Sequence, residues 1–135
     1  MVSFARLGLN AELQSSAAQA GFTSPTPVQA QAIGPVLNGR DVLATAQTGS
    51  GKTAAYVLPV LQLLMATAPS RDDTPKKRIT QVLVLVPTRE LATQVSDVLR
   101  DLARPLAKSI KVGTVFGGVS INPQTVSYTH LRAHE

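Results

Sequence analysis

The sequence predicts an α/β fold in which helices cover both faces of a parallel sheet, giving three layers. Segments with the apolar pattern of a strand alternate along the chain with segments of helical spacing. The run Gln81–Val86 is an almost unbroken series of valine and leucine, the pattern of a strand buried on both faces of a parallel sheet. Strand, helix and strand in this order imply right-handed crossovers.

The first two predicted helices have clear ends. One begins after Asn10, a residue type that caps helix N-termini, and stops at Gly21. In the next, Thr26 stands at the cap position and Pro27 at the first helical position, and apolar residues recur at helical spacing as far as Asn38-Gly39. These signals predict a short helix followed by a longer one.

Two more helices are predicted further along the chain. An apolar run extends from Thr53 towards Met65, with Pro59 placed to kink the helix or to end its first segment. The fourth helix runs from Thr88 to Arg104 and shows one apolar face. The predicted strands occupy residues 41–46, 82–86 and 112–116, and residues 67–79 form a polar loop.

Composition narrows the possible chemistry. A chain of 135 residues is one small domain at most, and without cysteine it has no disulfides, thiolate zinc sites or cysteine nucleophiles. No stretch approaches the roughly 20 apolar residues of a membrane span, and no secretion signal is evident, so a cytoplasmic location without membrane contact is expected. The formal charge of +5 favours polyanionic partners such as nucleic acid.

The segment Ala46–Thr53 is the strongest functional signal. It reads Ala-Gln-Thr-Gly-Ser-Gly-Lys-Thr between a predicted strand and a predicted helix, where a phosphate-binding loop works. Its glycines let backbone N–H groups turn towards phosphate oxygens, and the helix start adds further amides. Lys52 would reach the β and γ phosphates, and the Thr53 hydroxyl would bind Mg²⁺. The alternative is a glycine-rich turn with an incidental Lys-Thr pair.

Three further motifs agree with this loop in order and spacing. Gly21–Gln29 reads Gly-Phe-Thr-Ser-Pro-Thr-Pro-Val-Gln with the isolated aromatic Phe4 upstream, Pro87–Ala92 reads Pro-Thr-Arg-Glu-Leu-Ala, and Gly117-Gly118 follows the third predicted strand. Together with the loop, they resemble the Q motif, motif Ia and the paired-glycine motif of a DEAD-box ATP-dependent RNA helicase. The resemblance covers residues 2 to about 124.

The resemblance implies an incomplete first RecA-like lobe of the P-loop NTPase fold over residues 1–124, with ATP and Mg²⁺ as cofactors and RNA as partner. Residues 125–135 form a tail that departs from the family, which suggests a non-native origin. The implied nucleotide-binding residues are Phe4, Gln29, Ala46, Gln47, Thr48, Gly49, Ser50, Gly51, Lys52 and Thr53, with Thr53 also the Mg²⁺ ligand. The implied RNA-binding residues are Pro87, Thr88, Arg89, Gly117 and Gly118.

Several of these residues have a structural alternative. Thr26 and Gln29 have the spacing of a capping box, in which Gln29 satisfies the helix N-terminus, whereas the resemblance makes Gln29 the residue that reads adenine. Thr88 could serve only as a helix cap, and Gly117-Gly118 could be a plain turn at the end of a strand.

The family's remaining motifs, Pro-Gly-Arg, Asp-Glu-Ala-Asp and Ser-Ala-Thr, do not occur in the sequence, and the catalytic set is therefore incomplete. The chain itself is expected to bind adenine nucleotide weakly and to turn it over negligibly, whereas the parent protein would couple ATP hydrolysis to RNA unwinding or remodelling of RNA-protein complexes. The rival interpretations are another P-loop nucleic-acid-dependent ATPase, a non-catalytic nucleotide- or RNA-binding module, and a fragment that does not fold stably.

Overall fold

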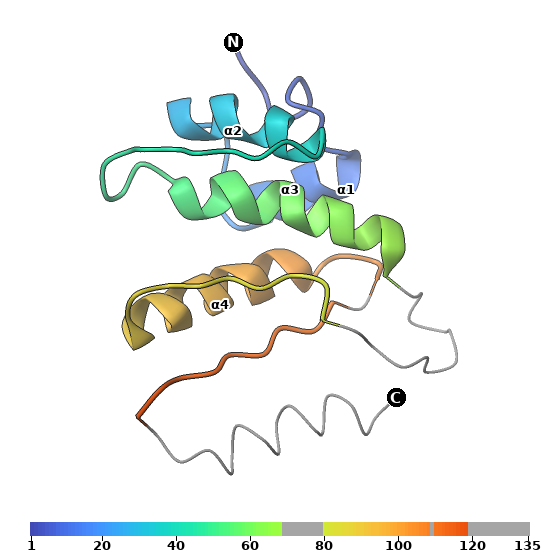
Figure 1. Cartoon of the computed structure of the whole chain (residues 1–135). Helices are drawn as coiled ribbons and strands as arrows, with labels where there is room; N and C mark the ends of the chain where they lie inside the picture. Colours follow the sequence, from blue (N-terminus) through green and yellow to red (C-terminus); the bar gives the residue numbers. More distant parts are fainter. Residues whose placement is uncertain (69–79, 109, 119–135) are drawn as a thin grey trace.

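The computed structural model describes residues 1–68, 80–108 and 110–118. In these residues the chain forms four helices (Figure 1): α1 (Ala11–Gln19), α2 (Pro27–Leu37), α3 (Lys52–Thr67) and α4 (Arg89–Ala103). Most of the predicted polar loop, and the whole of the tail 125–135, lie outside the described residues. Within the described part of the chain, every helix is too short or too polar to cross a bilayer.

The helices begin where the capping signals predict. The Asn10 side chain accepts a hydrogen bond from the Leu13 amide at 2.9 Å at the start of α1. The Thr88 hydroxyl accepts from the Leu91 amide at 3.2 Å at the start of α4. Pro27 occupies the first position of α2. These local signals are confirmed because a cap acts on amides only two or three residues away.

Pro59 lies inside α3 and does not end it. The helix continues to Thr67, although proline removes one backbone hydrogen bond and costs about 3 kcal/mol in a helix interior. Pro59 is itself fully buried, and Leu58 and Leu61 beside it have no exposed surface. Burial of each such leucine is worth about 2 kcal/mol, enough to offset the lost bond.

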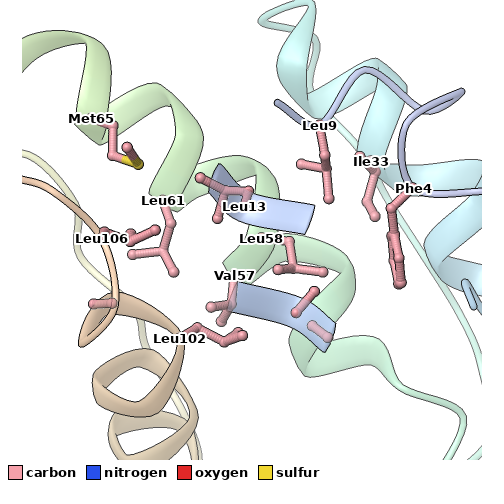
Figure 2. Packing of buried hydrophobic residues seen from close by; sticks show 13 residues of the cluster. Phe4, Leu9, Leu13, Ile33, Val57, Leu58, Leu61, Met65, Leu102 and Leu106 are labelled. Carbon is pink, nitrogen blue, oxygen red and sulfur yellow. The ribbon is translucent and has the colours of Figure 1, made fainter. Parts of the chain in front are cut away.

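The hydrophobic core centres on α3. Val57, Leu58 and Leu61 of α3 are completely buried, and α3 contacts each of the other three helices. Figure 2 shows Leu13 from α1 and Leu102 from α4 beside these residues. Because the loop that ends in Lys52 leads directly into α3, the core fixes the position of that loop.

The predicted strands are the part of the fold that differs from expectation. Residues 41–46 and 81–86 run as extended stretches that connect helices, and residues 110–116 form a third such stretch after α4 (Figure 1); the described residues contain no regular strand ladder. Leu83 and Leu85 are 77% and 84% exposed, whereas Val84 and Val86, which alternate with them, are half-buried. The expected burial on both faces is therefore wrong for the described chain. Successive side chains of an extended segment point to opposite sides, and only one side here is partly covered.

Candidate functional site

The loop Ala46–Thr53 ends in a helix start suited to an anion. Gly49 and Gly51 have φ of 82° and 86°, values that glycine adopts readily and other residues rarely do. Gly51 is the N-cap of α3 and offers no side chain, and the first turn of α3 contains no acidic residue. At the starts of α1 and α4, by contrast, the side chain of the N-cap residue accepts a hydrogen bond from one of the first backbone amides. The first amides of α3 are thus left for a ligand, which is how helix N-termini bind phosphate.

The loop is folded onto itself. The Lys52 ammonium donates to the carbonyl oxygen of Ala46 across the loop, and the Ser50 amide donates to the carbonyl of Gln47 at 3.2 Å. Residues Gln47–Gly49 and Lys52 are exposed, so a ligand can reach them. The Ser50 hydroxyl is buried and has no hydrogen-bond partner in the described chain.

Gln29 connects α2 to this loop. Its side chain has no exposed surface; the Oε1 atom accepts from the Thr26 amide at 3.0 Å and the Nε2 atom donates to the carbonyl oxygen of Gly51 at 3.1 Å. A Cβ atom on Gly51 would lie 2.5 Å from Nε2 and 3.2 Å from the Thr26 hydroxyl. The capping role of Gln29 is confirmed, and the same side chain also holds the phosphate-binding loop.

The amide of Gln29 retains unused capacity. A primary amide has two N–H donors and two acceptor lone pairs, and the two bonds described use one of each. The remaining donor and acceptor match the paired acceptor and donor on the edge of adenine. Gln29 has no exposed surface, so a base could reach this remaining capacity only if the surroundings of the side chain opened, and the role in adenine recognition stays a prediction.

Phe4 lies in the hydrophobic core. It is 6% exposed and belongs to the same cluster as Ile33, which follows Gln29 by one turn of α2 (Figure 2). Gln62 of α3 holds the following segment by accepting from the Asn10 amide at 2.8 Å and donating to the Gly8 carbonyl at 2.9 Å. The structure places Phe4 near α2, with its ring packed on aliphatic side chains, and its proposed contact with nucleotide stays a prediction.

Thr53, the expected magnesium ligand, is half-buried in the first turn of α3. Burial raises the pKa of the Tyr56 phenol above its ordinary value, while a hydrogen bond with the Thr53 side chain acts in the opposite direction. Three or more acidic or histidine side chains do not gather at any point of the described residues. The role of Thr53 as a magnesium ligand stays a prediction.

The second group of candidate residues lies at the start of α4. Pro87, Thr88 and Arg89 are exposed, and the Thr88 hydroxyl caps the helix as the structural alternative predicts. Gly118 has φ of 73°, and a Cβ atom on it would lie 2.6 Å from Nη2 of Arg89. The Arg89 guanidinium therefore packs against the Gly118 backbone. We call Gly117-Gly118, both exposed, the glycine turn.

The sequence analysis did not identify two polar residues, Arg100 and Thr114, that contact each other close to the glycine turn. Arg100 of α4 donates through Nη2 to the Thr114 hydroxyl at 3.3 Å, and Thr114 precedes the glycine turn on the same extended segment. A signal for Arg100 was present in the sequence, because it follows Arg89 by eleven positions, about three helical turns, and shares its face of α4.

Comparison with known proteins agrees with this geometry. The DEAD/DEAH box helicase family matches residues 26–133. The match includes most of residues 125–135, which the sequence analysis interprets as a tail that departs from the family. The chain is 46% identical over 120 residues to the ATP-dependent RNA helicase SrmB of Escherichia coli, covering 89% of this chain and 26% of SrmB. It is 44% identical over 116 residues to the ATP-dependent RNA helicase DeaD of the same organism, covering 86% of this chain and 17% of DeaD.

Solved structures of helicases share the fold. The RNA helicase Prp28 from Chaetomium thermophilum, bound to ADP, superposes with a TM-score of 0.77 at 35% identity, over 95% of this chain and 30% of Prp28. A DEAD box protein from Methanococcus jannaschii gives a TM-score of 0.71 at 33% identity, over 92% of this chain and 31% of that protein. The chain thus has the P-loop helicase fold and spans about a quarter of the length of SrmB. It belongs to the DEAD/DEAH box helicase family.

Proposed function

We propose that this chain binds an adenine nucleotide at Gln29 and Ala46–Thr53 and the backbone of single-stranded RNA at Pro87–Arg89 and the glycine turn. Within a longer protein these two sites serve ATP-dependent unwinding or remodelling of RNA. The observation that supports this best is the bond from Gln29 to Gly51, because it joins the candidate adenine reader to the phosphate-binding loop. Family membership supports the same pair of ligands.

Each residue of the nucleotide site has a distinct task in this proposal. The open amides at the start of α3 bind phosphate oxygens, and Lys52 exchanges the Ala46 carbonyl for a phosphate. Thr53 offers its hydroxyl to the magnesium ion, and Gln29 uses its remaining donor and acceptor on the base. When bound, ATP and Mg²⁺ supply the phosphoryl group and the charge neutralisation that its transfer needs. Phe4 contributes indirectly, by packing in the core against α2, the helix that carries Gln29.

The RNA site is proposed to read the backbone. Arg89 presents a guanidinium beside an exposed glycine turn, so a phosphate can approach both the side chain and the backbone amides. Contacts of this kind are tolerant of sequence and weaken steeply as salt rises. The net charge of +5 attracts the same ligand from a distance.

Turnover is proposed to need more than this chain. Phosphoryl transfer requires a bound metal, an aligned water and charge stabilisation together, and the described residues provide the phosphate cradle. We therefore expect nucleotide binding without measurable hydrolysis. RNA-stimulated phosphate release by the 135-residue chain, abolished by Lys52→Ala, would overturn this part of the proposal.

The nucleotide site is tested by titrating the chain with fluorescent ATP and GTP analogues in the presence of Mg²⁺. Wild type is expected to prefer ATP, Gln29→Ala to lose that preference, and Lys52→Ala to bind both analogues more weakly. Gln31→Ala is the matched control, because Gln31 is an exposed glutamine of the same helix. If Gln29→Ala keeps the preference for ATP, the side chain serves only as a cap and clamp.

The RNA site is tested by fluorescence anisotropy with a labelled single-stranded oligouridylate at several salt concentrations. Arg89→Met is expected to weaken binding and to reduce the slope of log affinity against log salt by about 0.7, the value for one phosphate contact on a single strand. A matched DNA oligonucleotide separates an RNA helicase from a DNA translocase. Binding that does not respond to salt, or that favours DNA, would contradict the proposal.

A further inference from the structure

Helix α4 presents a polar stripe of Arg89, Thr93, Ser96 and Arg100. Successive members are three or four positions apart and therefore lie on one face. The first member contacts the glycine turn at Gly118, and the last contacts Thr114, four residues earlier on the same extended segment. The stripe is thus joined to the segment that ends in the glycine turn at two separate points.

The guanidinium of Arg100 is held by its own helix. Its Nη1 atom donates to the Ser96 hydroxyl at 3.3 Å and lies 3.6 Å from a carboxylate oxygen of Asp97, while its Nη2 atom donates to Thr114. Ser96 in turn donates to the Thr93 carbonyl at 2.9 Å. A guanidinium has five N–H donors in a fixed plane, so these partners on α4 orient the donor that reaches Thr114.

The two contacts are separated by similar distances along α4 and along the extended segment that ends in the glycine turn. Arg89 and Arg100 are about 16 Å apart along the helix axis at about 1.5 Å per residue. Thr114 and Gly118 are about 13 Å apart along an extended chain at about 3.3 Å per residue, and the long arginine side chains span the difference. The segment runs opposite to α4, because the early arginine meets the late residue of the segment.

We propose that Arg100, through Thr114, is a positioning residue that sets the orientation of the glycine turn for RNA binding. The inference rests on the proposed RNA site. Arg89 holds the turn at one point, and the contact of Arg100 one short stretch upstream restricts how the segment can rotate about that point. Arg100 acts through the protein, whereas Arg89 and the glycine turn meet the RNA.

The first test does not use RNA. The 135-residue chain is labelled with ¹⁵N-glycine, which gives signals from nine glycines. Thr114→Val removes the hydroxyl with little change of shape, and Arg100→Met removes the guanidinium. Both variants are expected to shift the amide signals of Gly117 and Gly118 in the same direction and to leave the signals of Gly49 and Gly51 in place. Unmoved Gly117 and Gly118 signals would overturn the proposal, and unchanged signals of the glycines before residue 110 show that the variants remain folded.

The second test measures RNA affinity with the labelled oligouridylate. Thr114→Val and Arg100→Met are each expected to weaken binding by about fivefold, the equivalent of one ordinary hydrogen bond, and the double variant by no more than either alone. Arg40→Met is the control for charge, since Arg40 is exposed and lies after α2. Adenine nucleotide affinity should be unchanged in all of these variants.

The outcomes separate this inference from the proposed function. If wild type fails to bind RNA, the proposed RNA site is wrong, and the glycine signals still report whether the contact orients the turn. If wild type binds RNA and Arg100→Met weakens binding while Thr114→Val has no effect, Arg100 touches phosphate directly and the positioning role is wrong. Additive losses in the double variant would contradict it as well.

Discussion

The side-chain amide of Gln29 donates to the carbonyl oxygen of Gly51 at 3.1 Å across 22 positions of sequence. The bond couples the start of α2 to the start of α3, and Gly51 leaves room for it because it has no side chain. A shift of the loop backbone at Gly51 would therefore move the Gln29 side chain, and a shift of that side chain would move the loop. Each half of the pair can be altered separately.

Replacing Gly51 tests the contact directly. Gly51→Ala places a methyl group 2.5 Å from the Gln29 amide nitrogen and strains a positive φ, so we expect the free energy of unfolding to fall by about 2 kcal/mol or more. Gly49→Ala is the control, because φ is equally positive but no atom lies within 4 Å of the added Cβ. Urea denaturation of the nucleotide-free chain gives both values. Equal losses would mean that the contact with Gln29 contributes nothing to stability.

The two residues of the glycine turn allow a second comparison. Gly118→Ala would displace the Arg89 guanidinium, since the new Cβ would lie 2.6 Å from Nη2, and we expect RNA affinity to fall about five- to tenfold. At Gly117 a Cβ atom meets nothing within 4 Å and φ is not positive, so Gly117→Ala should have a smaller effect. Anisotropy titrations at one fixed salt concentration compare the two. The reverse order would show that Arg89 is not held by Gly118.

Ser16 of α1 stabilises the end of α4. Its hydroxyl donates to the Leu102 carbonyl at 2.5 Å, and the side chain is buried. Ser16→Ala leaves that carbonyl without this partner, which should lower the free energy of unfolding by about 1 to 3 kcal/mol. Ser15→Ala, on the exposed side of the same helix, should change it by less than about 0.5 kcal/mol. Thermal or urea unfolding followed by circular dichroism measures both, and similar values for the pair would contradict the assigned role.

Tyr56 makes stability depend on pH in the alkaline range. Burial raises the pKa of its phenol above 10.0 in the folded chain, so the folded state holds the proton more tightly than the unfolded state does. This contribution to stability is complete below the unfolded pKa and is lost as pH rises through the folded pKa. Urea midpoints measured between about pH 8 and pH 11 should therefore fall less steeply in Tyr56→Phe than in wild type. Parallel curves would show that Tyr56 has the same pKa in both states.

The sequence predicted those features that depend on neighbouring residues. Asn10 and Thr88 cap their helices because each side chain meets amides of the next turn. The strand 82–86 was less predictable, since its apolar run shows that the side chains can be buried but not which other segments cover them. In the structure, Leu83 and Leu85 are exposed because no described segment covers them.

Some parts of the candidate site could likewise be predicted from the sequence, and others could not. The loop Ala46–Thr53 was predicted because one short segment contains glycines, Lys52 and a helix start. The bond from Gln29 to Gly51 and the contact of Arg89 with Gly118 could not be predicted from spacing, because each joins segments that only the tertiary packing brings together. Arg100 was overlooked although its helical register matches Arg89, since a register shows a shared face and not what lies opposite it.

The exposed leucines of segment 81–86 also govern how this chain behaves in bulk solution. Leu83 and Leu85 lie on an extended backbone without a ladder partner in the described residues, and such an edge attracts a like edge from another molecule. The charge of +5 keeps molecules apart, but salt screens that repulsion beyond about 10 Å at 0.1 M, and RNA neutralises it outright. Salt and RNA should therefore both promote clustering of the chain. Light scattering recorded at each step of an RNA titration distinguishes a bound monomer from a condensed assembly.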